Sequence, residues 1–170
     1  MRWGMFWGVL FAALAAVTPA PAASAFSDWA AIVVAGDWHA HDGGPSEVFD
    51  NARRDLAGEL VGIGFSPGDI IVVSACFSGV FLPALEAPNR IVLTAAAPDR
   101  TSFGCGAADK YTFFDTCALQ WLTKAGDFAD FGKDVIACVE SREKKEKVDQ
   151  PSNPQLFIGA NAAGAMPRWK

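Results

Sequence analysis

Apolar residues along the chain form short unbroken runs that alternate with longer stretches of helical spacing. The clearest run, residues 70–73, has four consecutive β-branched residues and no polar alternation. Such a run is typical of a strand that is covered on both faces, as in a parallel sheet. Similar runs predict further strands over 30–36, 91–96 and 155–159.

The stretches between these runs carry apolar residues at intervals of three and four, which predicts helices. The longest begins after Ser46, a suitable N-cap, and extends from residue 47 to residue 63, where Gly64 ends it. Further helices are expected over 111–123 and 128–147, and a short helical or irregular segment is expected over 80–85. Strands that alternate with helices indicate an α/β fold with a mostly parallel sheet flanked by helices.

The first 25 residues have the pattern of a signal peptide. Arg2 precedes an apolar stretch over 5–17, and the small residues at 23–25 fit a cleavage site before Phe26. We therefore expect an exported protein, periplasmic or extracellular, that contacts a membrane only if this segment is retained as an anchor. The mature domain is expected over 26–160, with a loose tail over 161–170.

The composition narrows the class of protein. Of the 170 residues, 51% are hydrophobic and 19% are charged, which excludes a disordered chain and suits one globular domain. The net charge of −5 argues against a nucleic-acid partner, because few basic residues remain to neutralise phosphates.

The strongest candidate for chemistry is Cys76, which follows the run at 70–73. In a parallel sheet, functional groups collect beyond the carboxyl ends of the strands, and a thiol placed there is a plausible nucleophile. The alternative is a buried structural cysteine, since cysteine is among the most buried residue types.

The other three cysteines are Cys105, Cys117 and Cys138. If Cys76 remains a thiol, at most one disulfide can form among them, and the sequence does not select the pair. A structural zinc site is not expected, because the chain has only two histidines and no Cys-x-x-Cys motif. Hydrolysis by a thiol needs no cofactor, and none is expected.

Two motifs together carry a family resemblance. Residues 74–79 read Ser-Ala-Cys-Phe-Ser-Gly, and residues 94–105 read Thr-Ala-Ala-Ala-Pro-Asp-Arg-Thr-Ser-Phe-Gly-Cys. With these motifs the chain resembles the legumain-like cysteine peptidases, and most closely their exported bacterial members. The resemblance implies a caspase-like fold, a three-layer sandwich of helices on both faces of a sheet. It also implies a cysteine endopeptidase that acts on a peptide or protein substrate.

The resemblance also assigns roles to residues. It implies that Cys76 is the nucleophile, that its backbone amide helps to bind the oxyanion, and that Ser102 lines the substrate pocket. Asp115 lies where family members place acidic or polar pocket residues. The alternatives are a turn role for Ser102 and a helix-surface charge for Asp115.

One element of the family pattern is missing. Family members carry a His-Gly motif at the end of a separate strand before the nucleophile strand, and that histidine is the general base. Here residue 64 leads within a few residues into the run at 70–73, so the domain is shortened near 69–71 and the sheet lacks a central strand. His41 is the candidate substitute base, with His39 beside it, because the loop after the first strand faces the same side as Cys76. The alternative is that both are solvated loop residues.

The sequence therefore predicts a cysteine endopeptidase of the legumain-like type, impaired by the absence of the family histidine. Two alternatives remain open. One is a non-catalytic caspase-fold protein that binds or regulates, and the other is a sequence that lacks a segment of an active peptidase.

Overall fold

A computed structural model of the chain describes residues 26, 29, 31, 34–35, 44–65, 73–106 and 108–168. The elements in chain order are β1 Val34–Ala35, α1 Val48–Gly62, β2 Val73–Ser74, the 3-10 helix η1 Ser78–Phe81, α2 Leu82–Leu85, β3 Ile91–Thr94, α3 Phe113–Leu122, α4 Phe128–Lys145, β4 Gln155–Ile158 and α5 Ala160–Ala165. Strands and helices alternate through much of the chain, so the predicted α/β class is confirmed.

The four strands form one sheet in the order β1-β2-β3-β4. β1 with β2 and β2 with β3 are parallel, over two Cα pairs and one Cα pair, whereas β3 and β4 are antiparallel over four pairs. The prediction of a mostly parallel sheet is therefore not confirmed for the described residues. Much of the predicted strands at 30–36 and 70–73 lies outside those residues.

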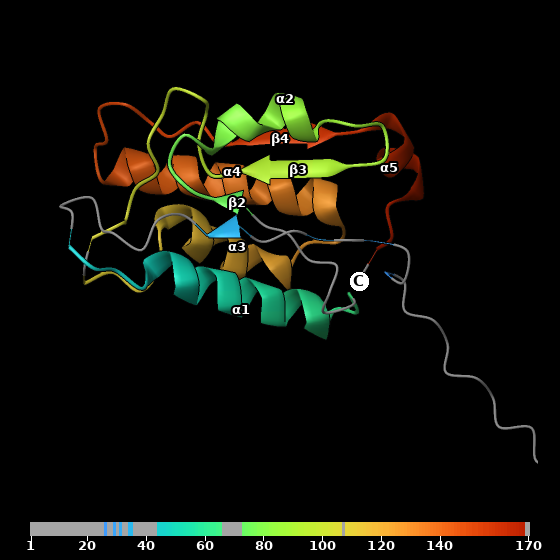
Figure 1. The fold of residues 1–170 in the computed structure, drawn as a ribbon, viewed down its shortest axis with the longest axis horizontal. Coiled ribbons are helices and arrows are strands. Elements are labelled where there is room, and N and C mark those ends of the chain that lie inside the picture. Colours follow the sequence, from blue (N-terminus) through green and yellow to red (C-terminus); the bar gives the residue numbers. More distant parts are fainter. Residues whose placement is uncertain are drawn as a thin grey trace, which may run out of the picture.

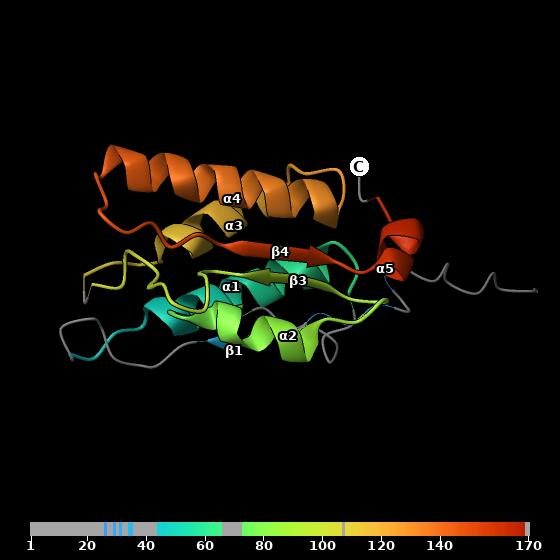
Figure 2. The ribbon, with the colours of Figure 1, turned by 90° about the horizontal axis from the view of Figure 1, so that it is seen from above.

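Helices cover the sheet from both sides. Figures 1 and 2 show α3 and α4 on one face of the sheet and the short α2 on the other, with α1 beside β1. The main core lies between α1, α3 and α4, with side chains such as Leu56, Phe114 and Val135 almost fully buried. None of the helices in the described part of the chain is long and apolar enough to cross a membrane.

One disulfide joins the two long helices on this face, between Cys117 in α3 and Cys138 in α4. The sequence predicts at most one disulfide among Cys105, Cys117 and Cys138, and the structure has this one. Cys76 and Cys105 are present as thiols.

The C-terminal segment is more ordered than the sequence suggested. Helix α5 occupies much of the segment predicted to be a loose tail, and the backbone amides of Asn161 and Ala162 donate to the carbonyl oxygen of Pro88. Arg168 forms an ion pair with Asp127 at 3.2 Å. The prediction of a loose tail is therefore wrong, because backbone and ionic contacts with the domain hold this segment.

Candidate active site

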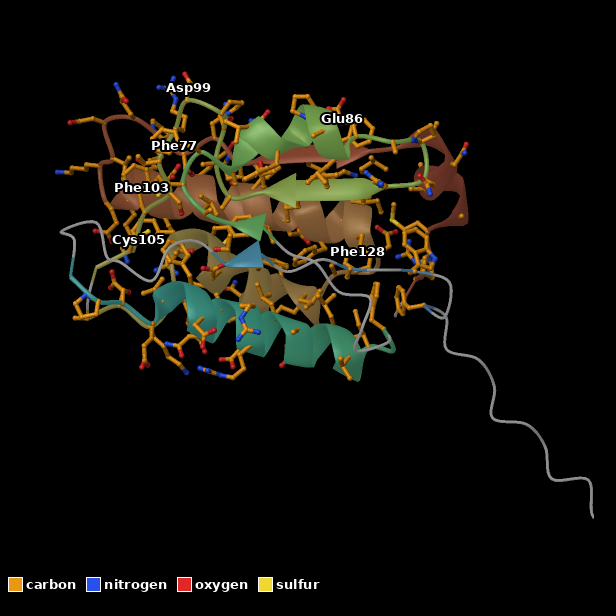
Figure 3. All side chains as sticks on the ribbon, viewed as in Figure 1. Phe77, Glu86, Asp99, Phe103, Cys105 and Phe128 are labelled. Atoms are coloured by element: carbon orange, nitrogen blue, oxygen red, sulfur yellow. A yellow bond between two sulfur atoms is a disulfide. The ribbon has the colours of Figure 1, made fainter. Side chains whose placement is uncertain are left out.

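Cys76 lies in the turn that follows β2, at the end of the sheet toward which β3 points. Its side chain is half-buried. Phe77, the next residue, has left-handed backbone geometry with φ of 57°, and its side chain is exposed. Figure 3 shows Phe77, Phe103 and Cys105 gathered at this end of the sheet. The turn after β2 and the loop after β3 therefore meet here, as expected for neighbouring parallel strands.

Hydrogen bonds hold the turn against the loop after β3. The Phe77 amide donates to the carbonyl oxygen of Arg100 at 2.9 Å, and the Ala96 amide donates to the hydroxyl of the fully buried Ser78 at 3.1 Å. Because both bonds are made by the residues that directly follow Cys76 in the chain, they restrict where its thiol can lie.

Cys76 and Ser102 lie next to each other, and the contact uses the backbone of Ser102 and not its hydroxyl. The Ser102 amide donates to Cys76 Sγ at 3.4 Å, and the Cys76 thiol donates to the Ser102 carbonyl oxygen at 3.9 Å. The Ser102 residue is only 7% exposed, so little of it is open to a bound peptide. Its role in a substrate pocket stays a prediction, whereas its contact with the candidate nucleophile is a feature of the structure.

Cys105 is a neighbour of Cys76 that the sequence analysis did not assign to the site. Its thiol donates to the same Ser102 carbonyl oxygen at 3.9 Å, and its side chain packs in a small cluster with Val48 and Phe49. A hydrogen bond with Cys76, burial, and the nearby charge of Cys76 together raise the pKa of Cys105 far above its ordinary value. Cys105 therefore stays protonated beside the candidate nucleophile. The available sequence signal was its place three residues after Ser102 in the same short loop.

Asp115 lies inside the protein rather than on a surface that a substrate could reach. It is 0% exposed, and its carboxylate Oδ2 accepts a hydrogen bond from the Thr112 hydroxyl at 2.6 Å. Thr112 is the N-cap of α3, and its hydroxyl in turn accepts from the Asp115 amide. A substrate-binding role for Asp115 stays a prediction, whereas the alternative of a helix-surface charge is wrong, because the residue is fully buried. The physical reason is this reciprocal cap, which keeps the carboxyl group within the fold.

Burial raises the pKa of the Asp115 carboxyl, and the hydrogen bond from the Thr112 hydroxyl opposes the rise only in part. Between the unfolded and the folded pKa, the folded state holds more protons, so the free energy of unfolding falls as pH rises through that interval. We expect Asp115→Asn to remove this fall, which has a limiting slope of about 1.4 kcal/mol per pH unit. Urea unfolding from about pH 4 to about pH 8 measures it. The control variant is Asp149→Asn, since Asp149 is exposed. Equal slopes of unfolding free energy against pH in wild type, Asp115→Asn and Asp149→Asn would contradict the assignment of this pH dependence to Asp115.

The candidate bases fall outside the described part of the chain. His39 and His41 are among the residues that the structure does not describe, so no distance to Cys76 can be stated. His41 as a substitute base therefore stays a prediction. Within the described residues, no three histidine, cysteine or acidic side chains gather as a metal site would require.

Comparison with known proteins gives one match. The model of the Peptidase C13 family matches residues 68–147, a segment that contains Cys76, Ser102, Cys105 and Asp115 but neither histidine. No curated protein and no solved structure matches the chain. The match implies a caspase-like fold, which agrees with the α/β architecture. Residues 68–147 are therefore similar to the peptidase C13, or legumain, family of cysteine peptidases.

Proposed function

We propose that the chain is a cysteine endopeptidase in which the Cys76 thiolate is the nucleophile. The observation that carries the proposal is the position of Cys76 at the carboxyl end of β2, within the family segment, with its sulfur accepting a hydrogen bond from the Ser102 amide. An amide that donates to sulfur favours the charged form of a thiol over the neutral form. The thiolate, not the thiol, is the attacking species in such enzymes.

The reaction is a two-step acyl transfer. The Cys76 sulfur attacks the carbonyl carbon of the scissile peptide bond, and the C–N bond breaks to release the amine and leave a thioester. Water then attacks the thioester and releases the carboxylic acid and the thiolate. The leaving amine needs a proton, and His41 is the proposed donor in place of the missing family histidine. The Cys76 backbone amide is the proposed oxyanion donor.

The family suggests protein substrates, and the finer assignments are proposals. We infer cleavage after Asn or Asp from the resemblance of the two motifs to legumain-like enzymes. We also propose that the chain is exported by its N-terminal signal segment. The Cys117–Cys138 disulfide supports export, because disulfides persist in oxidising compartments and are rare in the cytosol.

A second candidate function is that of a non-catalytic family member that binds peptides or proteins. One sequence observation favours it: the segment that carries the histidine of family members is missing between residues 64 and 70. A cysteine without a base retains only its intrinsic thiolate fraction at neutral pH, and loss of general acid–base catalysis costs about 100-fold to 10,000-fold in rate.

The test is the pH dependence of Cys76 alkylation in the full-length chain. Iodoacetamide labelling is followed by peptide mass spectrometry from about pH 5 to about pH 9, a window that brackets the ordinary cysteine pKa of about 8.5. We expect Cys76 to be labelled with a midpoint well below that value. A peptidyl electrophile with Asn or Asp at the reacting position should then label the same residue.

Two variants make this result specific. Cys76→Ser should lose the low-pH labelling, and Cys105→Ser should keep label on Cys76, which identifies the reacting sulfur. A Cys76 midpoint at or above the ordinary thiol value, with no reaction with the peptidyl electrophile, would reject the peptidase proposal and support the non-catalytic candidate.

A further inference from the structure

The thiol of the candidate nucleophile, Cys76, and the thiol of Cys105 both donate to one carbonyl oxygen, that of Ser102. The Cys76 and Cys105 sulfurs each lie 3.9 Å from the Ser102 oxygen, and Cys76 packs against the small cluster that contains Cys105. The rest of the described chain has its other two cysteines already joined in a bridge. Cys76 and Cys105 are therefore a matched pair of reduced sulfurs that sit within reach of one another.

The loop that carries Cys105 is held in place by its own turn. Gly104 has a left-handed φ of 78°, and a Cβ there would lie 2.9 Å from the Phe113 ring. The Phe113 amide donates to the Phe103 carbonyl oxygen at 2.9 Å, which ties the loop to the start of α3. Because the loop is fixed on both sides of Gly104, Cys105 is kept facing the Ser102 carbonyl.

The two sulfurs differ in access. Cys76 is half-buried and lies beside the exposed Phe77, whereas Cys105 is 8% exposed and packs against the start of α1. A small oxidant from solvent therefore meets Cys76 first, and Cys105 is then the nearest thiol that can react with the product. This is the arrangement of an attacking cysteine with a resolving cysteine.

We propose that Cys76 and Cys105 are a redox-active dithiol that hydroperoxides convert to a disulfide, which blocks the nucleophile until a thiol reductant restores it. This inference rests on the proposed function for its regulatory meaning, since only a working nucleophile can be switched off. The dithiol chemistry itself depends only on the two sulfurs and their geometry.

The oxidation proceeds in two balanced steps. The Cys76 thiolate attacks one oxygen of hydrogen peroxide, an S–O bond forms, the O–O bond breaks, and the departing hydroxide takes a proton to become water. Cys76 is then a sulfenic acid. The Cys105 sulfur attacks the Cys76 sulfur, the S–S bond forms, the S–O bond breaks, and the Cys105 proton leaves with hydroxide as a second water. Two thiols have lost two electrons, and the peroxide has gained them.

The charge of the Cys76 thiolate is one of the causes that raise the pKa of Cys105, so the rise becomes smaller once Cys76 has become a neutral sulfenic acid. Until then, a protonated Cys105 does not compete with Cys76 for electrophiles, so the half-buried Cys76 reacts before the buried Cys105. Its proton is also available to the leaving hydroxide in the second step.

The test treats the reduced full-length chain with hydrogen peroxide, stops the reaction with catalase, and maps peptides without a reducing agent. We expect a linked peptide pair that contains Cys76 and Cys105, separate in mass from the Cys117–Cys138 pair. Native iodoacetamide labelling of Cys76 should be lost in parallel and should return fully with dithiothreitol.

Cys105→Ser is the matched control, with Cys105→Ala as a second variant if the hydroxyl disturbs the small cluster. In either variant, peroxide should leave Cys76 as a sulfenic acid that dimedone traps, and part of the label should be lost irreversibly as sulfinic acid. Wild-type protein that forms sulfenic or sulfinic acid on Cys76 while Cys105 remains a thiol would overturn the proposal. The linked peptide is scored without any hydrolysis assay, so its presence and the failure of the peptidase proposal are separate results.

Discussion

Replacing Gly79 by alanine is expected to lower the free energy of unfolding by about 3 kcal/mol. Gly79 is buried in η1, and a Cβ at this position would lie 2.6 Å from the Pro98 nitrogen and 2.7 Å from the Ala97 carbonyl carbon. These are backbone atoms that cannot rotate away, so either η1 or the loop after β3 has to shift. The midpoint of urea unfolding measures the loss.

The same substitution should also reduce the reactivity of Cys76. Gly79 lies three residues after Cys76, and the turn between them is held by hydrogen bonds to the loop that Gly79 touches. When that contact opens, the Ser102 amide no longer lies at its 3.4 Å distance from Cys76 Sγ. We expect the pH midpoint of Cys76 alkylation to rise toward the ordinary thiol value in the fraction of variant that remains folded.

Gly58→Ala is the control for this prediction. Gly58 is exposed within α1, and a Cβ added at this position would have no heavy atom within 4 Å beyond its own helix backbone and chain neighbours. Alanine should therefore stabilise the protein by about 0.5–1 kcal/mol through helix propensity. Opposite signs for the two glycines are the expected result. A Gly79→Ala protein as stable as the Gly58→Ala protein would show that η1 is not packed tightly against the loop.

Elements with long, regular patterns were predictable from the sequence. The helices expected over 111–123 and 128–147 are α3 and α4 within a few residues at each end, because each combines helical apolar spacing with a polar N-cap residue. The strand expected over 155–159 is β4, and it runs antiparallel to β3, a direction that the sequence did not predict. An apolar run shows that a strand is buried and does not show which way its neighbour runs.

The site was predictable in part. The position of Cys76 after a buried strand followed from the apolar run, because the end of a strand is visible in sequence. The burial of Asp115 depends on a cap with Thr112, and the pattern Thr-x-x-Asp was a usable signal for it. The contact between Cys76 and Cys105 depends on how two loops fold against each other, and the spacing of 29 positions between them in the sequence carries no such information.

Removing the Cys117–Cys138 disulfide is expected to destabilise the protein by about 3 kcal/mol, through the greater freedom of the unfolded chain. The bridge closes a loop with a sequence separation of 21, which contains the turn between α3 and α4. Alanine is the better replacement at both positions, because Cys117 is fully buried and a hydroxyl there would lack a partner.

The measurement compares urea unfolding of wild-type protein, oxidised and reduced, with that of the Cys117→Ala/Cys138→Ala variant. Reduced wild type and the variant should unfold at similar, lower urea concentrations, and reductant should have no further effect on the variant. Cys105→Ala is the control, since Cys105 is not in a bridge in this structure. A double variant as stable as oxidised wild type would contradict the prediction. It would mean that packing between α3 and α4 alone, around Phe114 and Val139, carries the stability of this face.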